Sequence, residues 1–198
     1  MGPKPKQWRG TKMSKKLAIA IAAAVCVAGI AGNASAGSST TNLSVQATVA
    51  ANCSISSTAV NFGAYDPVGA NASTDKNGTG TLTVSCTKNS AGVTLTLGLG
   101  GNASGSTRRM LGGTNGDFLT YELYHPIANT PGAACTGAQV WGTVGAAILT
   151  PSGVAGWGAG AGNAKTFNVC GIIPQAQNVS GTAAGESYTD TVVATVNF

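Results

Sequence analysis

The sequence has few charged residues and few of the groups that carry out chemistry. Asp, Glu, Lys and Arg make up only 9% of the chain, and His125 is the single histidine. No two cysteines form a CxxC motif, which argues against a structural zinc site, and no Gly-x-Ser-x-Gly motif marks a hydrolase nucleophile. These absences predict a protein that is not an enzyme and that binds no metal and no cofactor.

The carboxylates form no recognisable catalytic pair. Asp66, Asp117, Glu122 and Asp190 have no spacing that singles out two of them for acid–base work. We instead expect Asp66 and Asp190 to cap turns and the starts of strands, as short acidic side chains often do.

Two further polar positions are expected at the surface. His125 precedes a proline, so we expect it in a solvated turn. Arg108 and Arg109 are adjacent and could bind an acidic partner, but we expect them to form a solvated strand end.

The first 36 residues are typical of an export signal. Six of the eleven Lys and Arg residues precede an apolar run, Leu17–Ile30, and Ala34-Ser35-Ala36 has the small-x-small form of a cleavage site. Translation starts at Met1 or at Met13, because Met13 also opens a segment of normal signal form. An uncleaved membrane anchor is the alternative, although the apolar run is shorter than the ~20 residues of a membrane span.

The basic character of the whole chain belongs to this signal. Without residues 1–36, five basic residues stand against six acidic ones, and the net charge changes from +5 to about −1. No basic patch remains, which argues against nucleic acid or an anionic membrane as a partner.

Four cysteines remain after the expected cleavage, an even number that suits two disulfides in an exported chain. Three connectivities are possible. We favour the pairs that are nearest in sequence, Cys53–Cys86 and Cys135–Cys170. Each would close a loop of roughly 35 residues and contribute about 3–4 kcal/mol in the chain-entropy model. A metal site is the alternative, and the lone histidine argues against it.

Short alternating segments dominate the mature chain, and none shows a sustained helical period. Strands are expected at residues 43–49, 53–55, 60–62, 81–86, 93–99, 118–124, 166–172 and 188–198. Tyr65-Asp66-Pro67, Asn77-Gly78 and Asn115-Gly116 predict turns. The stretch Gly153–Gly162 predicts a loop, because it lacks the Lys-Ser/Thr of a phosphate-binding loop. Many short strands with glycine-rich turns predict an all-β protein of the β-sandwich type.

The strand expected at the start of the mature chain has two interpretations. Its apolar side chains alternate with polar ones and are Leu43, Val45, Ala47 and Val49. It is either the first strand of the domain's own sheet or a donor strand that completes the sheet of a neighbour. Burying its larger apolar side chains would contribute roughly 5–8 kcal/mol before entropy costs, with ladder hydrogen bonds added. Such head-to-tail contacts do not close, so their repetition would give a filament.

The end of the chain is the second strand of interest. Val192, Ala194, Val196 and Phe198 fall at even spacing, with polar or small residues between most of them. Chain ends usually fray, so a strand that reaches the terminal carboxylate is expected to have a specific role in assembly.

Several motifs, in order and at similar spacing, resemble one known family, the spore coat U domain proteins of archaic chaperone–usher pili. The resemblance covers nearly all of the mature chain. The motifs that carry it are Val49-Ala50-Ala51-Asn52-Cys53-Ser54-Ile55, Asn61-Phe62-Gly63-Ala64-Tyr65-Asp66-Pro67, Gly80-Thr81-Leu82-Thr83-Val84-Ser85-Cys86-Thr87, Arg109-Met110-Leu111, Leu119-Thr120-Tyr121-Glu122-Leu123-Tyr124, Cys170-Gly171-Ile172-Ile173-Pro174 and Tyr188–Phe198.

The resemblance implies an incomplete immunoglobulin-like β-sandwich of the pilin type, completed by a donor strand. In that scheme residues 1–36 are a signal peptide, 37–51 the donor-strand segment and 52–198 the pilin domain. A periplasmic chaperone lends a strand, and an outer-membrane usher exchanges it for the segment of the next subunit. Leu43, Val45, Ala47 and Val49 would be donor side chains. The C-terminal strand would be one wall of the acceptor groove and the docking edge of the chaperone.

The resemblance also implies a place and a role. The protein would pass through the periplasm to a cell-surface pilus that serves attachment and biofilm formation, with copies of itself or related pilins as partners. A single domain favours a main shaft subunit over a two-domain tip adhesin, and a minor subunit has the same features. The chain departs from the family pattern at His125-Pro126, where an acidic residue is common, and in its second cysteine pair.

An alternative from a different functional class is a monomeric exported coat or binding module. In that case the N-terminal strand would fold back into the domain's own sheet. Deleting residues 37–50 separates the two hypotheses, because a pilus subunit would lose its polymers and a self-complemented module would lose its fold.

Overall fold

The computed structural model describes residues 37–152, 156–157, 163–182 and 185–198. The expected signal peptide and most of the stretch Gly153–Gly162 lie outside these residues. Residues up to Gln46 and residues 47–198 form two separate units. Within the described part of the chain, no helix is long and apolar enough to cross a membrane.

The described domain is built from antiparallel β-strands, as the alternating sequence predicts. In chain order the elements are β1 (Cys53–Asn61), β2 (Lys76–Cys86), β3 (Thr94–Leu97), β4 (Arg108–Gly112), β5 (Phe118–Pro126), β6 (Ala138–Val140), a short 3₁₀ helix η1 (Gly145–Ala147), β7 (Lys165–Ile173), β8 (Tyr188–Thr189) and β9 (Ala194–Asn197). The fold class is therefore all-β, and η1 is a single helical turn.

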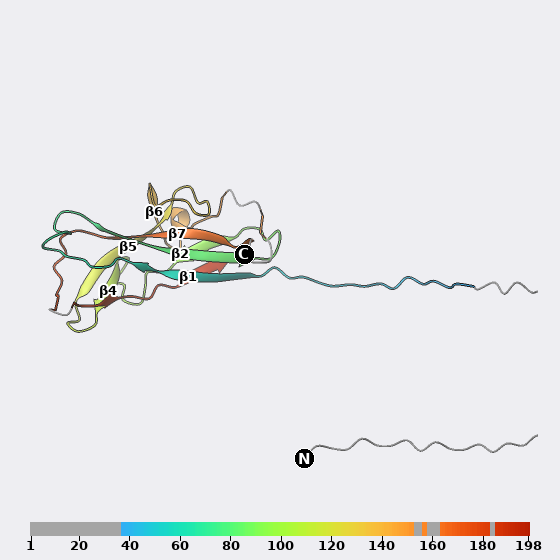
Figure 1. Cartoon of the computed structure of the whole chain (residues 1–198), viewed down its shortest axis with the longest axis horizontal. Coiled ribbons are helices and arrows are strands. Elements are labelled where there is room, and N and C mark those ends of the chain that lie inside the picture. The colour runs from blue at the N-terminus through green and yellow to red at the C-terminus, as the bar shows by residue number, and fades with distance from the viewer. Residues whose placement is uncertain (1–36, 153–155, 158–162, 183–184) are drawn as a thin grey trace, which may run out of the picture. The chain divides into compact units, whose positions relative to one another are not determined.

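Two sheets enclose the core. The larger sheet has the order β1-β2-β7-β5-β4-β8, with β6 paired to β5, and it curls along its length (Figure 1). The smaller sheet contains β3 and β9. Alternation positions the core: Leu82, Val84 and Cys86 are buried on β2, whereas Thr81, Thr83 and Ser85 between them are half-buried on the other face.

One edge of the core is closed by two residues from the connection between β6 and β7. Trp141 and Leu149 are fully buried, and the Trp141 Nε1–H donates to the Leu95 carbonyl over 3.0 Å. The Leu149 and Leu95 backbones also exchange two hydrogen bonds. This satisfied indole explains why a large aromatic side chain fits beside β3.

Both disulfides have the pairing that sequence proximity favours. Cys53 bonds to Cys86, and Cys135 bonds to Cys170. The first joins directly opposite residues of β1 and β2. The second joins β7 to the segment that precedes β6.

One predicted turn was wrong. Asn77-Gly78 is not a turn but part of β2, where Gly78 pairs with Gly171 of β7. A side chain at Gly78 would collide with Phe62, since an added Cβ would lie 2.7 Å from its Cδ1. The glycine therefore marks a close approach inside a strand rather than a reversal of the chain.

The C-terminal strand is divided rather than continuous. Tyr188–Thr189 pairs with β4 in the larger sheet, whereas Ala194–Asn197 pairs with β3 in the smaller one. The residues between them carry the chain from one sheet to the other. One expected strand thus becomes β8 and β9, on both sides of the core.

The segment expected as the first strand has no regular secondary structure. No strand is assigned to residues 37–52. The side chains of Leu43, Val45 and Val49 are 86, 85 and 84% exposed.

Candidate strand-acceptor groove

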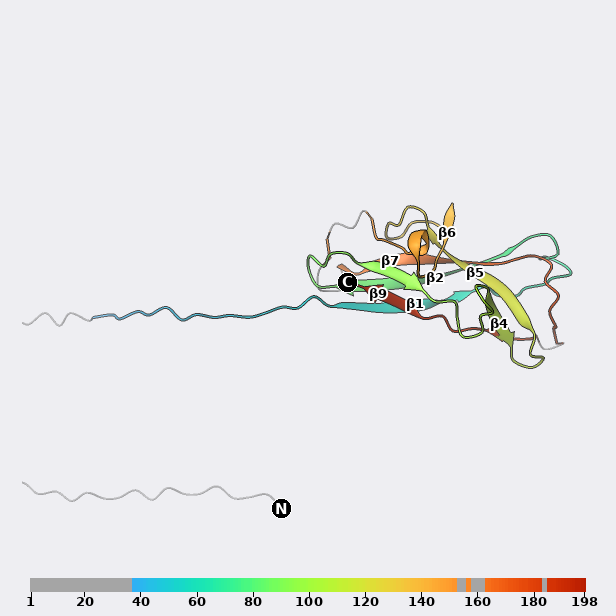
Figure 2. The ribbon, with the colours of Figure 1, turned by 180° about the vertical axis from the view of Figure 1, so that it is seen from behind.

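In the described part of the chain, β1 and β9 each have one edge without a ladder partner. Among the residues that the structure describes, β1 pairs only with β2, and β9 pairs only with β3. Parts of β1 and β9 approach within 8 Å between Cα atoms and lie side by side, but they share no ladder (Figure 2). Each strand therefore presents one edge whose N–H and C=O groups are free of ladder bonds.

A small cleft of about 380 Å³ lies between these edges. One wall is formed by residues 57–60 of β1, and the other by residues 190–192 and 194, before and at the start of β9. Its floor is the core itself and contains Leu82, Leu97, Tyr121, Leu123 and Val169. Because these side chains are large and apolar, the cleft suits apolar side chains from a further strand.

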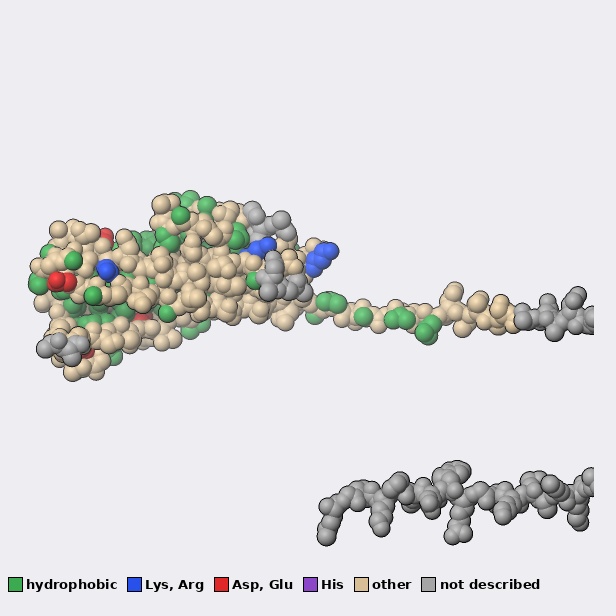
Figure 3. Space-filling view, viewed as in Figure 1, with side chains coloured by type: hydrophobic (Ala, Val, Ile, Leu, Met, Phe, Trp, Pro, Cys, Tyr) green, Lys and Arg blue, Asp and Glu red, His purple; other side chains and the backbone are tan. Residues whose placement is uncertain are grey.

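A larger cleft of about 780 Å³ adjoins the small one and is lined by some of the same residues. Its walls are residues 59–65, 67 and 68 on one side and residues 179–182 and 185–188 on the other, and its floor includes Met110, Leu119 and Ile173. Hydrophobic side chains gather in a hollow at the end of the domain that carries β4 and β5 (Figure 3). We call the two clefts together the groove.

The two walls run in opposite directions. From the small cleft to the large one, residue numbers rise along the β1 wall and fall along the C-terminal wall. A strand laid in the groove would therefore run parallel to one wall and antiparallel to the other. It could form ladder bonds with both, each contributing about 0.5–1.5 kcal/mol net.

A ridge formed by Val60 and Phe62 lines both clefts. The β1–β2 register shifts between Thr58 and Asn61, so the chain leaves the regular ladder there. The ridge rests on glycines of β2 and β7: a Cβ on Gly171 would lie 2.5 Å from Phe62 Cζ and 2.7 Å from Val60 Cγ1. These glycines allow the two side chains to lie flat on the sheet.

The C-terminal wall carries the side chains that were expected there. Val192, Ala194 and Val196 are half-buried and pack against the core, and the residues between them are exposed. Val192 and Ala194 also line the small cleft. Phe198 is 54% exposed.

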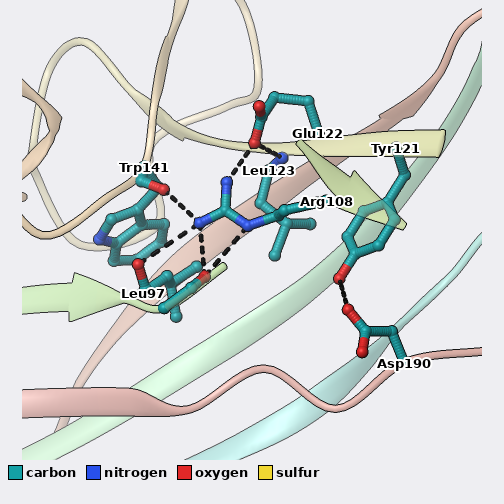
Figure 4. Close-up of polar contacts among 8 residues, drawn as sticks. Leu97, Arg108, Tyr121, Glu122, Leu123, Trp141 and Asp190 are labelled. Carbon is teal, nitrogen blue, oxygen red and sulfur yellow. Dashed lines mark hydrogen bonds and ion pairs between the residues drawn. The ribbon is translucent and has the colours of Figure 1, made fainter. Parts of the chain in front are cut away.

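Asp190 fixes the point where this wall crosses between the sheets. The Tyr121 hydroxyl donates to its Oδ2 over 2.7 Å (Figure 4), and the backbone N–H groups of Asn102 and Thr191 donate to Oδ1. Burial raises the pKa of the Tyr121 hydroxyl above its usual range, and the hydrogen bond to Asp190 raises it further. Asp190 therefore caps a backbone turn, as expected, and also holds the wall to β5. Asp66 caps its own turn by accepting from the N–H groups of Val68 and Gly69.

Arg108 is not solvated, contrary to the expectation from sequence. It is 1% exposed, forms an ion pair with Glu122, and donates to the Gly98 carbonyl over 2.7 Å and the Trp141 carbonyl over 2.6 Å (Figure 4). A guanidinium can satisfy several acceptors at once, which explains its burial here.

Arg109 is half-buried rather than fully solvated. Its guanidinium lies 3.9 Å from the centre of the Phe118 ring, and its Nε–H donates to the Asn102 carbonyl over 3.1 Å. These contacts tie β4 to Phe118 of β5 and to the turn that precedes β4.

His125 is also buried rather than solvated, because β5 continues through it to Pro126. It is 2% exposed, and its ring meets Trp141 edge-on at 5.6 Å between centroids. Its environment is the packed core. No group of three or more His, Cys, Asp or Glu that could hold a metal ion occurs among the described residues.

Sequence reasoning missed the floor of the groove and its ridge. Val60-Asn61-Phe62 was expected as a short strand, and nothing in its pattern marks the register shift. The glycines at 78, 80 and 171, which lie inside strands, are the signal that points to a close approach of other side chains.

Comparisons with known proteins bear on the family of the chain. No curated protein sequence matches it. A solved structure with some similarity is the chaperone–tip adhesion subunit pre-assembly complex CsuC–CsuE, from archaic chaperone–usher Csu pili of Acinetobacter baumannii. The similarity has 19% identity and a TM-score of 0.46, and it covers 76% of this chain and 41% of that chain, so this chain spans less than half of that one. The family description Spore Coat Protein U domain matches residues 39–195, and the chain belongs to that family.

Proposed function

We propose that the chain is a structural subunit of a chaperone–usher surface pilus that polymerises by donor-strand exchange. The observation that carries this proposal is the groove, with its apolar floor and two edges without ladder partners among the described residues. A sandwich that is left open along one line can be completed by one further strand. Membership of the Spore Coat Protein U domain family supports the same function.

Leu43, Val45, Ala47 and Val49 are the donor side chains in this proposal. They alternate with polar residues, and the three larger ones are exposed. In strand conformation, the seven residues 43–49 would span about 24 Å. Val192, Ala194 and Val196, together with Phe198, form the edge that receives the strand or docks the chaperone. Burying the larger donor side chains contributes roughly 5–8 kcal/mol before entropy costs.

The partners and the location follow from this mechanism. A periplasmic chaperone covers the groove before assembly, and an outer-membrane usher replaces it with residues 37–51 of the next copy or of a related pilin. The domain that receives the strand is residues 52–198. The product is a cell-surface pilus for attachment and biofilm formation, with this chain as its main shaft subunit. Neither an enzymatic activity nor nucleic acid has a part in this function.

The test compares unheated and boiled SDS gels of the full chain expressed with its chaperone and usher. The wild type gives a ladder of regular steps that collapses to monomer on boiling. Leu43→Asp with Val45→Asp abolishes the ladder, because the charges would be buried on the groove floor. Ser44→Asp with Gln46→Asp is the matched control, since it adds the same charge on the other face of the strand and keeps the ladder.

A monomer band in both lanes, from wild-type protein that is soluble and folded before electrophoresis, would overturn the proposal. That result would favour the monomeric exported module whose sandwich is completed by its own N-terminal strand. Deleting residues 37–50 would then unfold the domain, whereas a pilus subunit keeps its chaperone-bound form.

A further inference from the structure

Opposite charges gather at the two ends of the domain. We infer that, in the polymer, the end of one copy that carries lysines docks against the end of the next copy that carries carboxylates. The partner at this surface is therefore a second copy of the chain. The inference rests on the proposed function, because a shared strand is what holds these two ends together.

Two lysines lie at the end of the domain where β1 begins, which we call the lysine end. Cys53 starts β1 opposite Cys86 at the end of β2, and Lys88 follows two residues later and is exposed. Lys165 starts β7 beside the same end of β2. The carboxyl group of Phe198 lies at this end too (Figure 1), so the lysine end has an excess of one positive charge.

Four carboxylates lie at the opposite end, which we call the acidic end. Asp75 is exposed just before β2, and Asp66 is exposed in the turn that follows β1. Asp117 precedes β5, and Glu186 lines the larger cleft. Lys76 starts β2 at this end, so four carboxylates against one lysine leave an excess of three negative charges.

These charged groups have no ion-pair partner in their own domain. Within the described ranges, the one ion pair joins Arg108 to Glu122. Arg109 lies over the Phe118 ring and lowers the negative excess of the acidic end to two. One oxygen of Glu186, Oε2, is buried without a hydrogen-bond partner among the described residues. Because a buried acceptor without a donor costs free energy, a donor from a partner would stabilise it.

The two ends are too far apart to neutralise each other within one domain. β2 runs from the acidic end to the lysine end, and its eleven residues span about 35 Å. The Debye length is only about 8 Å at physiological ionic strength. Figure 3 shows Lys and Arg side chains at the end where β1 begins, and Asp and Glu side chains towards the other end, together with one basic group. This distribution suits a head-to-tail contact, in which unlike ends meet.

A short connection holds the lysine end of one copy close to the groove of the next. In the proposed polymer, residues 43–49 occupy that groove, and only Ala50-Ala51-Asn52 separate them from β1. Even fully extended, the chain from Val49 to Cys53 spans about 14 Å. Asn52 is hydrogen-bonded to the residue before Lys88. Lys88 therefore lies near the end of the groove from which the segment leaves.

Charge distinguishes the two ends of the groove. If the segment left at the small cleft, its domain would bring lysines towards the lysine end of the receiving copy. If it leaves at the larger cleft, the lysines meet the acidic end. Attraction favours the second arrangement, in which residues 43–49 run parallel to the β1 wall and antiparallel to the C-terminal wall. Single surface ion pairs are weak, but the shared strand keeps these groups at a high effective concentration.

The first experiment is a zero-length cross-link. Polymers of the full chain, assembled with chaperone and usher, are treated with a water-soluble carbodiimide, which joins a lysine amine to a carboxylate that it touches. We expect a ladder that survives boiling in SDS, unlike that of the untreated polymer. Peptide mapping of the covalent dimer should find Lys88 or Lys165 joined to Asp66, Asp75 or Glu186.

Arginine variants are the control for this cross-link. Lys88→Arg with Lys165→Arg keeps both positive charges and the heat-sensitive ladder, but it removes the amines and therefore the covalent ladder. Lys76→Arg is the matched control at the acidic end and keeps the covalent ladder. A covalent ladder that persists without Lys88 and Lys165 comes from another amine and would contradict the inference.

The second experiment exchanges the charges of the two ends. Lys88→Glu with Lys165→Glu should slow growth of the ladder about fivefold, because two negative ends then meet. Adding Ser73→Lys, Thr74→Lys and Asp75→Lys, all exposed at the acidic end, should restore the rate.

Two controls accompany this exchange. Lys76→Glu makes the same change as Lys88→Glu at the other end of the domain and should not slow growth. The difference between the reversed variant and the wild type should disappear at about 1 M salt, where the Debye length is ~3 Å.

The inference and the proposed function fail in different ways. If the wild type forms its ladder but gives no covalent dimer through Lys88 or Lys165, or if charge reversal leaves growth unchanged, the inference fails and the proposed function stands. Slow growth that the exchanged charges do not restore would assign the lysines to the chaperone or the usher and would also overturn the inference. If the folded wild type forms no ladder at all, the proposed function fails, and the inference fails with it.

Discussion

The two sides of this sandwich are finished differently. Beside β3, the core is closed by Trp141 and Leu149, and Arg108 satisfies the carbonyls that meet there. Beside β1, comparable apolar side chains lie on the floor of clefts of about 780 and 380 Å³. Trp141 and Leu149 fill the closed side, whereas on the open side β1 and β9 each have one edge without a ladder partner among the described residues. In the proposed function, the open side is the one used for assembly.

The largest effect is expected from breaking the closed side. Arg108→Ala leaves Glu122 without its cation and removes the guanidinium donor from three backbone carbonyls, which should lower the free energy of unfolding by about 3 kcal/mol. Urea unfolding measures this loss. Arg109→Ala is the control, because Arg109 donates to one carbonyl and contacts the Phe118 ring, so its removal should cost only about 1 kcal/mol. Equal losses in both variants would contradict the assignment.

The disulfides sharpen the comparison, because one anchors β1, a wall strand of the groove, and the other does not. Their sequence separations are 33 and 35 residues, so removing either by Cys→Ser changes should cost a similar amount, about 3 kcal/mol. Only loss of Cys53–Cys86 frees the start of β1, the strand that forms one wall of the groove. We therefore expect a weaker SDS-resistant ladder for that variant alone. A ladder weakened equally by loss of Cys135–Cys170 would show that stability, not the wall, controls assembly.

A smaller effect is expected at the ridge. Gly171→Ala should displace Phe62 and Val60 at a cost of about 1–3 kcal/mol, since the new Cβ would lie within 2.7 Å of both. Gly113→Ala serves as the control, because its nearest neighbour would be 3.7 Å away. Thermal unfolding of both variants measures the difference. A Gly171→Ala protein as stable as the control would mean that the ridge is free to move.

The smallest effect concerns Tyr121, whose pKa is raised by burial and by its hydrogen bond to Asp190. The unfolded tyrosine loses its proton first, near pH 10, so the free energy of unfolding should fall as the pH rises above about 10. Tyr121→Phe should cost about 1 kcal/mol at neutral pH and reduce this alkaline loss. Unfolding at pH 8 and pH 11 measures both quantities. If the free energy of unfolding falls equally with pH in Tyr121→Phe, groups other than Tyr121 cause the fall.

The sequence predicts the elements whose pattern is local. Alternation places Leu119, Tyr121 and Leu123 on one buried face, and proximity gives both cysteine pairs. Features that depend on distant partners could not be predicted. Arg108 is buried because the carbonyls of Gly98 and Trp141 converge on it, and no local pattern signals this convergence. His125 is buried because β5 continues past it.

The same division applies to the candidate site. The alternating segment with Leu43 and Val45 is visible in the sequence, and so is the C-terminal strand with Val192 and Ala194. The floor of the groove is not, because it is formed by residues from several strands. The roles of donor and acceptor remain predictions.

The most direct measurement joins two copies. One copy carries Val45→Cys, and a second copy of different size carries Val192→Cys or Ala194→Cys, both expressed with chaperone and usher. Donor-strand exchange predicts a disulfide-linked species that contains both copies and that disappears when the first copy also carries Leu43→Asp and Val49→Asp. The opposite result is that no mixed species forms and that a cross-link appears only when one chain carries both cysteines. This result would contradict strand exchange and show that the sandwich is completed by its own segment.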